Sequence, residues 1–419
     1  MTTDSAIDTR DAELAAQYEA YPYPERNPAD EKTRLLIGSP SHLREIDYWV
    51  FGARRSPEMP LRVLIAGCGT GDGAIMLATH LARANRPGEV VCLDRSSHAL
   101  KIVQERAKVR DLHNMQFIQG SLTELDSLEL GLFDYIDCCG VLHHLPDPFT
   151  TLKALENRLA PGGGMGLMVY APYGRTGVYM LQEALEKITP FSESPSTRLD
   201  VAKRVMRHLP ATAWLHQNGN FGDHLNGGNA GLYDLLLNPR DRAYTITAFL
   251  DLLEQAGLEP SCLMEPARYD PALFLPDPKL RTRIEQMTPR EKAATAEELT
   301  GNMATHVVYV VRKGGRIVPP DACAVEAVPV MREIPGEELA KQILPNGTLP
   351  FAFGTLIVPI PLPAQARSIL PLIDGQRTVG KLASIMADRG MKEEKFFRIW
   401  KEMFTALESV NRLLLTYSK

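Results

Sequence analysis

The chain has 419 residues, of which 44% are hydrophobic and 23% charged, and its formal net charge is −5. This is the composition of an ordinary soluble globular protein with room for roughly two or three domains, and the mildly acidic balance argues against a nucleic acid as the main partner. The sequence shows neither an apolar run of about 18 residues nor a secretory leader, and its six cysteines form no CxxC pair, so we expect a cytoplasmic protein with reduced thiols and no membrane contact.

Residues 1–34 are polar and contain the aromatic sequence YEAYPYPERNP. Strand and helix patterns then alternate within residues 35–313, which predicts a sheet with helices on both faces. The predicted helices are 73–85, 97–110, 148–160 and 246–257, and the predicted strands are 62–66, 89–93, 115–119, 133–139, 165–170, 261–264 and 305–311. This order favours an α/β fold with a doubly wound seven-stranded sheet that ends in an antiparallel edge strand.

Two long inserts interrupt the alternation, at 171–241 and 276–304. Inserts of this length in such a sheet are often lids or substrate walls, so we expect them to form a substrate cap. Residues 314–348 are predicted to be a linker. Residues 349–419 are predicted to form a small C-terminal α+β domain.

The first predicted strand ends in a glycine-rich loop, VLIAGCGTGDGA at 63–74. Gly67, Gly69 and Gly71 allow a sharp turn and a close approach of a ligand to the backbone. The dinucleotide fingerprint GxGxxG is the nearest competing motif, but Asp72 stands where its third glycine would fall. Asp94 ends the next strand, where a carboxylate can accept both hydroxyls of a ribose, yet it lies further along than the nicotinamide fingerprint places it.

Two later stretches point to one family. FDYIDCCGVLHHLPDP (133–148) and LKALENRLAPGGGMGLMVY (152–170) resemble the corresponding parts of class I S-adenosylmethionine-dependent methyltransferases. Together with the glycine loop and Asp94, four motifs occur in the order of that family over roughly residues 60–170. The resemblance implies the class I methyltransferase fold, S-adenosyl-L-methionine as cofactor and methyl transfer as the reaction.

The resemblance also implies cofactor-binding residues. Backbone of the loop that contains Gly67, Cys68, Gly69 and Gly71 would lie against the methionine moiety, and Asp94 would bind the ribose.

The remaining cofactor contacts fall at three other places. Cys139 and Gly140 would face the methionine amino group. Ser121 stands where many relatives have an acidic residue near the adenine, and the backbone of Leu122 could make that contact instead. Tyr18 belongs to the N-terminal aromatic segment, which in many relatives folds over the cofactor as a lid.

Methyl transfer from a sulfonium is an in-line displacement that needs alignment, desolvation and, for some acceptors, removal of a proton. His143 and His144 follow the fourth strand and are candidate general bases, although either could instead cap a helix or bond to backbone. Tyr21, with its neighbours Tyr18 and Tyr23, could aim a hydroxyl or a ring face at the reacting groups. The alternative is a proline-stiffened strap with a structural role only.

The polar loop HQNGNFGDHLNGGNAG in the first insert is predicted to line the acceptor pocket. Its His216, Asp223 and His224 match no known ligand spacing and sulfonium transfer needs no metal, so we predict no metal site. Adjacent Cys138 and Cys139 lack the setting of a nucleophilic cysteine and are expected to be structural or cofactor-facing.

The C-terminal 70 or so residues resemble the winged-helix modules appended to some bacterial protein-modifying enzymes. Winged helices often bind DNA, but here the positive charge is slight and bulky apolar residues crowd one helix, so packing or protein docking is favoured. These bulky residues are Phe396, Phe397, Trp400, Phe404 and Leu407.

The leading functional prediction is a cytoplasmic methyltransferase acting on a small molecule, because GVLHHLPDP is similar to the fourth-strand motif of metabolite methyltransferases. The alternative is a protein methyltransferase, possibly on lysine, whose insert and tail grip a polypeptide. A third hypothesis is an S-adenosylmethionine-binding regulator without catalysis.

Overall fold

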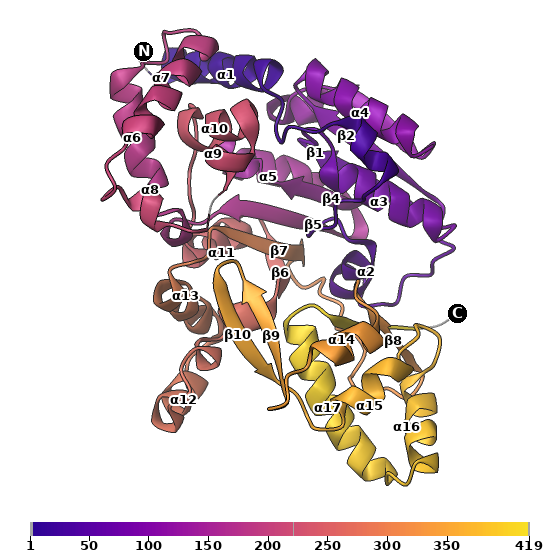
Figure 1. Cartoon of the computed structure of the whole chain (residues 1–419). Coiled ribbons are helices and arrows are strands. Elements are labelled where there is room, and N and C mark those ends of the chain that lie inside the picture. Colours follow the sequence, from indigo (N-terminus) through magenta and orange to yellow (C-terminus); the bar gives the residue numbers. More distant parts are fainter. Residues whose placement is uncertain (1–2, 221, 418–419) are drawn as a thin grey trace.

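The structure is a computed structural model that describes residues 3–220 and 222–417. Its centre is a seven-stranded sheet of order β3-β2-β1-β4-β5-β7-β6 (Figure 1). The strands are β1 (Leu61–Ala66), β2 (Gly88–Asp94), β3 (Met115–Gln119), β4 (Phe133–Cys139), β5 (Leu159–Tyr170), β6 (Leu258–Leu263) and β7 (Thr305–Arg312). The doubly wound seven-stranded α/β fold predicted from the sequence is therefore confirmed.

The position of the antiparallel strand differs from the prediction. β7 runs antiparallel to both β5 and β6 and lies between them, so β6 and not β7 forms the edge of the sheet. β5 begins at Leu159, opposite Phe133, because the glycine-rich sequence after it still pairs with β4 and β7. The predicted strand began six residues later, at the first apolar residue.

The helices cover both faces of the sheet because successive strand residues point to opposite sides. Val63 and Ile65 of β1 pack in one core cluster with α3 (Asp72–Arg83) and α4 (Ser97–Val109). Leu64 and Ala66 pack in the other with α5 (Pro148–Asn157) and α11 (Ile246–Gln255). The side chains of Ser96, Asp147 and Thr245 cap α4, α5 and α11 by accepting backbone N–H groups.

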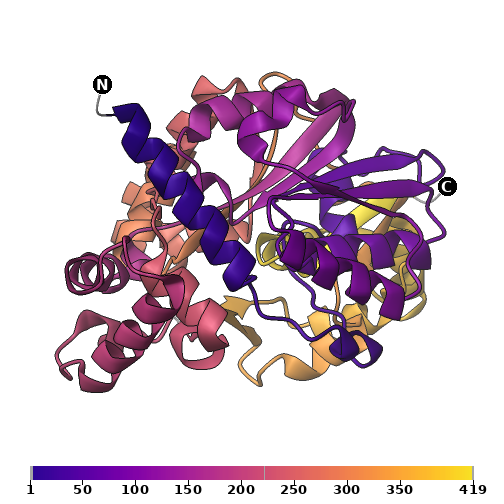
Figure 2. The same ribbon diagram turned by 90° about the horizontal axis from the view of Figure 1, so that it is seen from above.

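The first insert is a helical layer beside the strand ends. Its elements are η5 (Tyr173–Arg175), α6 (Val178–Ile188), α7 (Pro195–His208), α8 (Trp214–Gln217), α9 (Asp223–Asn226) and α10 (Gly228–Leu237). These helices share a small core of their own around Val178, Leu185 and Leu236. Helix α1 (Thr3–Ala20) crosses between this insert and the sheet, as the view from above shows (Figure 2).

The remaining short elements connect these layers. Three of them precede the first strand in the sequence: η1 (Pro28–Lys32), α2 (Leu43–Glu45) and the π-helical turn η2 (Ile46–Val50). The others connect strands of the sheet: η3 (Leu122–Ser127), η4 (Leu142–His144), η6 (Pro266–Tyr269), η7 (Pro271–Leu273), α12 (Pro278–Glu285) and α13 (Pro289–Thr300). Across the described residues, none of the helices combines the length and apolarity needed to cross a membrane.

The C-terminal unit begins earlier than the sequence predicts. Residues 327–342, in the predicted linker, form β8 (Ala327–Met331) and α14 (Gly336–Gln342), and β8 pairs with the last strand, β11 (Leu413–Tyr417). The other elements are the hairpin β9 (Thr348–Phe353) and β10 (Leu356–Pro361), then α15 (Ala366–Ile369), η8 (Leu370–Leu372), α16 (Val379–Asp388) and α17 (Glu393–Ser409). Its core is continuous with that of the sheet through Tyr48 and Trp49 of η2. The winged-helix assignment stays a prediction.

The N-terminal segment is attached to the domain by buried charges on α4. The guanidinium of Arg106 is almost fully buried and donates to Glu31 (2.8 Å), to the carbonyl of Thr70 (2.6 Å) and to Asp72 (2.8 Å). Arg110 also pairs with Glu31. The network ties η1, α4 and the glycine loop together.

Replacing Arg106 by methionine is expected to lower the free energy of unfolding by about 2–3 kcal/mol, because Glu31 and the Thr70 carbonyl then lose a buried donor. The measurement is the urea midpoint followed by circular dichroism. Arg34→Ala is the matched control, since Arg34 pairs with Asp30 at the surface and its removal should cost less than about 1 kcal/mol. Equal effects of the two substitutions would show that the network contributes no more than a surface pair.

Candidate functional site

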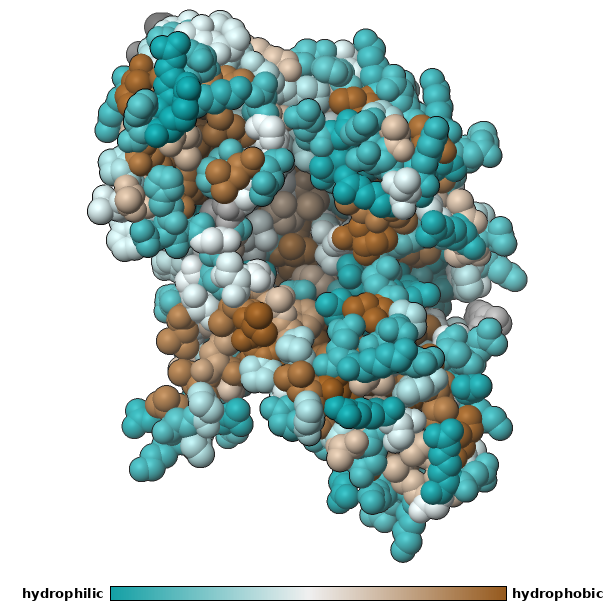
Figure 3. Space-filling view, viewed as in Figure 1, coloured by the Kyte–Doolittle hydropathy of each residue, from teal (hydrophilic) through white to brown (hydrophobic). Residues whose placement is uncertain are grey.

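A cavity of about 690 Å³ lies at the carboxyl ends of β1, β2, β4 and β5. This is the edge at which doubly wound sheets bind their ligands. The space-filling view shows a hollow with apolar walls in this region, above the hairpin β9–β10 (Figure 3). The volume is in the range of small-molecule sites, which is about 300–1,000 Å³.

The glycine loop forms one wall of the cavity. Gly67, Cys68 and Gly69 line it, and Gly67 and Gly69 have φ of 76° and 51°. A Cβ at Gly69 would stand 2.7 Å from the carbonyl oxygen of Tyr23, and one at Gly67 would stand 2.6 Å from a side-chain carbon of Val141. Both positions therefore require glycine, because the positive φ disfavours other residues and because a side chain would clash. Gly71, also predicted to bind the cofactor, caps α3 instead and is absent from the lining.

Asp94 stands at the tip of β2 and lines the cavity. Its carboxylate accepts the backbone N–H of Gly69 (2.7 Å) and of Ser96 (2.9 Å), so both oxygens are fixed in direction. Burial raises the pKa of this carboxyl, and the two N–H donors oppose that shift. The carboxylate still has lone pairs for a diol, as a ribose would offer.

The residues predicted near the adenine and the amino group also line the cavity. Ser121 and Leu122 lie at the start of η3, where Ser121 caps the turn by accepting the Thr123 N–H. Cys139 and Gly140 lie at the tip of β4. Burial raises the pKa of the Cys139 thiol well above its usual value, which keeps the sulfur protonated and agrees with a non-nucleophilic role.

Asp137, in the middle of β4, is a cavity carboxyl that the sequence reasoning missed. It accepts a hydrogen bond from Ser41, and burial raises its pKa to about 6. Its neighbours are residues 37–41, a strap that lines the same wall. The signal that could have found it is a charged residue inside an otherwise apolar buried strand.

The N-terminal segment covers the cavity with two of the three tyrosines that the sequence analysis named. Tyr18 and Tyr23 line the cavity. Tyr21, the predicted catalytic tyrosine, stacks on Tyr233 of α10 with ring centroids 5.3 Å apart and is absent from the lining, because it packs into the core of the insert. A direct role for Tyr21 in the reaction therefore has no support in this geometry.

Arg26 holds the same segment against the glycine loop. Its guanidinium makes a paired contact with Asp72, with one Nη2···Oδ2 distance of 2.7 Å, and both residues line the cavity. The hydroxyl of Thr70 donates to the carbonyl of Pro24 (2.6 Å). Asp72, which the sequence reasoning used only to argue against the nicotinamide fingerprint, is therefore the anchor of the lid.

The two histidines of η4 have different surroundings. His143 is completely buried against the ring of Tyr170, 3.9 Å between centroids, and does not line the cavity. Burial lowers its pKa well below the usual value, and neither ring nitrogen has a partner among the described residues. It is a neutral packing residue, which corrects the prediction that it faces the acceptor.

His144 lines the cavity. Its Nδ1 lies 2.6 Å from the carbonyl oxygen of Arg240, which can only accept, so Nδ1 carries the hydrogen. In the neutral ring Nε2 is then the basic nitrogen, as a general base requires.

A buried carboxylate from the insert also lines the cavity. Asp234 of α10 accepts the hydroxyls of Tyr18 (3.0 Å) and Tyr170 (3.3 Å), and burial raises its pKa. Arg175 lies over the ring of Tyr170 at 3.7 Å and pairs with Asp241 at 2.7 Å. Sequence reasoning missed Asp234 because it lies in an apolar helix far along the chain.

The polar loop of the first insert contributes less to this cavity than predicted. Among its described residues only Asn220 lines the cavity, whereas His216 and His224 line a separate hollow against α7. Phe221 and the side chain of Asp223 lie outside the described structure.

Residues 64–165 match the family model described as "Methyltransferase domain". An uncharacterized protein of Synechococcus sp. is 30% identical over 282 residues, which are 66% of this chain and 65% of that protein. A demethylmenaquinone methyltransferase of Listeria monocytogenes is 37% identical over 101 residues, 24% of this chain and 41% of that enzyme. The chain thus spans less than two thirds of the length of either relative.

Among solved structures, PKMT2 from Rickettsia typhi superposes with a TM-score of 0.62 at 15% identity, covering 90% of this chain and 76% of that one. Fold and cavity together define a doubly wound α/β domain with a cavity of small-molecule size at its strand ends. Residues 64–165 thus form a methyltransferase domain, and the sheet around it has the class I methyltransferase fold.

Proposed function

We propose that the cavity binds S-adenosyl-L-methionine and that the chain transfers its methyl group to a small-molecule acceptor. The residues present fit the cofactor: bare backbone at Gly67 and Gly69 for the amino-acid part, Asp94 for the ribose hydroxyls, and Asp137 for the ammonium group. When bound, the cofactor supplies an activated methyl group on a sulfonium. A structure of the Rickettsia typhi protein in complex with AdoHcy supports this assignment by fold.

The chain's own residues align the acceptor and exclude water. The lid formed by α1 and residues 21–26 closes one side of the cavity, and Tyr170 with Asp234 closes the other. An acceptor held beside Tyr18 and Asp234 lies next to His144, whose Nε2 takes the proton that the acceptor loses.

The observation that carries the proposal is Asp234. A buried carboxylate in the cavity wall that accepts two tyrosine hydroxyls is a convergent polar group that can orient one small ligand. The test is transfer of a labelled methyl group into a cell extract, separated by size. Label in the small-molecule fraction is expected; label only in protein would overturn this acceptor class.

A protein acceptor, possibly a lysine, is the second candidate, and one contact favours it. Asn220 lines the cavity and accepts the hydroxyl of Thr355 from the hairpin turn at 2.8 Å. The C-terminal unit thus reaches the mouth of the cavity, where a polypeptide would lie. If no fraction takes up label although the cofactor binds, the remaining hypothesis is a regulator without catalysis.

Cofactor affinity should depend on pH through Asp137. Its carboxyl has a pKa of about 6, so it is ionised above that pH and attracts the cofactor's ammonium group, and it is neutral below. We expect the affinity for S-adenosylhomocysteine to fall by up to about tenfold per pH unit below pH 6. Calorimetric titration at several pH values measures this affinity.

Asp137→Asn is the control for this dependence. The amide keeps an acceptor for Ser41 but has no charge at any pH, so affinity should be lower at pH 8 and nearly flat down to pH 5. If the affinity of this variant still falls below pH 6, the pH dependence comes from another carboxyl, such as Asp94.

A further inference from the structure

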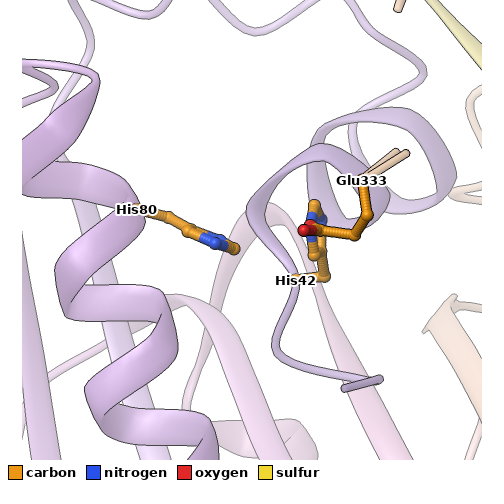
Figure 4. A group of neighbouring side chains, drawn as sticks. All are labelled: His42, His80 and Glu333. Carbon is orange, nitrogen blue, oxygen red and sulfur yellow. The ribbon is translucent and has the colours of Figure 1, made fainter. Parts of the chain in front are cut away.

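Three potential metal ligands converge away from the cavity, where the C-terminal unit meets the sheet domain. His42 precedes α2, His80 lies in the last turn of α3, and Glu333 follows β8, so the group joins parts that are far apart in the chain (Figure 4). One ligand atom from each residue lies within 4.8 Å of the other two. No other such group of His, Cys, Asp and Glu occurs in the part of the chain that the structure describes.

The side chains face one another closely. His42 Nε2 lies 2.5 Å from a carboxylate oxygen of Glu333, and the rings of His42 and His80 are 4.7 Å apart at a steep angle. His42 is 2% exposed, and its Nδ1 has no hydrogen-bond partner among the described residues. A plain ion pair between His42 and Glu333 would account for neither the free Nδ1 nor the second imidazole.

His80 supplies the second imidazole of the group, 4.7 Å from the ring of His42 between centroids. No hydrogen bond to this ring occurs among the described residues, and Figure 4 shows it pointing toward the other two side chains. Arg44 and Arg83 add positive charge near His80, which weakens the binding of a cation.

We propose that His42, His80 and Glu333 bind one zinc ion that links the C-terminal unit to the methyltransferase domain. Two imidazoles and one carboxylate suit zinc better than magnesium or calcium, which prefer oxygen ligands only. In a tetrahedral site, ligand atoms stand about 3.3 Å apart, as follows from bonds of about 2.0–2.1 Å. The Glu333 side chain is 34% exposed and free to adjust, and it leaves the fourth position open to water.

The test is calorimetric titration of the full chain with ZnCl₂ after treatment with a chelator. We expect one ion per chain, and a loss of affinity of at least about 100-fold in His80→Ala and in Glu333→Gln. His113→Ala is the matched control, because His113 is exposed and, among the described residues, pairs with Asp111 alone, so zinc affinity should be unchanged. Binding of equal strength in the wild type and in Glu333→Gln would overturn the proposal, as would no binding at all.

Two further readouts separate this site from adventitious binding to cysteines. Co²⁺ in place of zinc should give the visible absorption of a tetrahedral nitrogen and oxygen site, without the charge-transfer band of thiolate ligands. Zinc should also raise the melting temperature of the wild type but not that of Glu333→Gln, which lacks one of the three ligands. A thiolate band, or an equal rise in both proteins, would place the ion elsewhere.

Discussion

Asp94→Asn is expected to weaken binding of S-adenosylhomocysteine by about 100-fold. The Asp94 carboxylate is held in place by the N–H groups of Gly69 and Ser96, and it offers charged acceptors to two ribose hydroxyls. A hydrogen bond to a charged group contributes about 1.5–3 kcal/mol, and an amide replaces one of the two acceptors by a donor. Calorimetric titration of the purified protein gives the dissociation constant directly.

The control for this substitution is Asp126→Asn, a change of the same kind at an exposed position on η3 that does not line the cavity. Its affinity should equal that of the wild type. Unchanged affinity in Asp94→Asn would remove the ribose contact from the site. No heat with the wild type would remove the cofactor itself.

His144→Ala is expected to lower kcat by about 10²–10⁴-fold on an acceptor that loses a proton, with cofactor affinity unchanged. The reason is that the Arg240 carbonyl fixes the hydrogen on Nδ1 and leaves Nε2 as the base in the cavity. Single-turnover kinetics with labelled cofactor measure the step.

His143→Phe is the matched control for the neighbouring position. The substitution keeps an aromatic ring against Tyr170 and removes nitrogens that have no partner among the described residues, so turnover should change far less than in His144→Ala. Equal losses in the two variants would indicate a packing effect. A full rate in His144→Ala would show that the acceptor needs no base from this residue.

Most of the sheet could be predicted because its strands are short apolar runs between helices with clear caps and a period near 3.6. The place of β7 could not, because its pairing with both β5 and β6 depends on contacts between residues far apart in sequence. β8 falls within the predicted linker for the same reason, because it pairs with β11, which is the last strand of the chain and far away in sequence.

The cofactor side of the site could be predicted better than the acceptor side. Gly67, Gly69 and Asp94 belong to local motifs, and the backbone of a turn fixes where they point. Whether His143 or His144 faces the cavity depends on one step of a short 3₁₀ turn, which sequence patterns do not resolve. The choice between Tyr21 and Tyr23 depends likewise on how the N-terminal segment docks.

Residues brought in by tertiary contacts had no such signal. Asp234 comes from a helix of the insert, and Arg26 meets Asp72 across 46 residues of sequence. Both are ordinary charged residues until the fold places them in a cavity.

The strap at residues 37–41 owes its position to the sheet beneath it. The carbonyl oxygen of Pro40 accepts the hydroxyls of Tyr135 (2.6 Å) and Tyr309 (2.7 Å), which rise from β4 and β7. The side of the cavity that carries this strap is thereby bonded directly to the sheet, while the side formed by α1 is a separate segment held by contacts such as Tyr18 with Asp234 and Ser97 with Glu19. We therefore expect ligands to enter and leave by displacement of the helix, with the tyrosine-backed side as the fixed surface against which they are aligned.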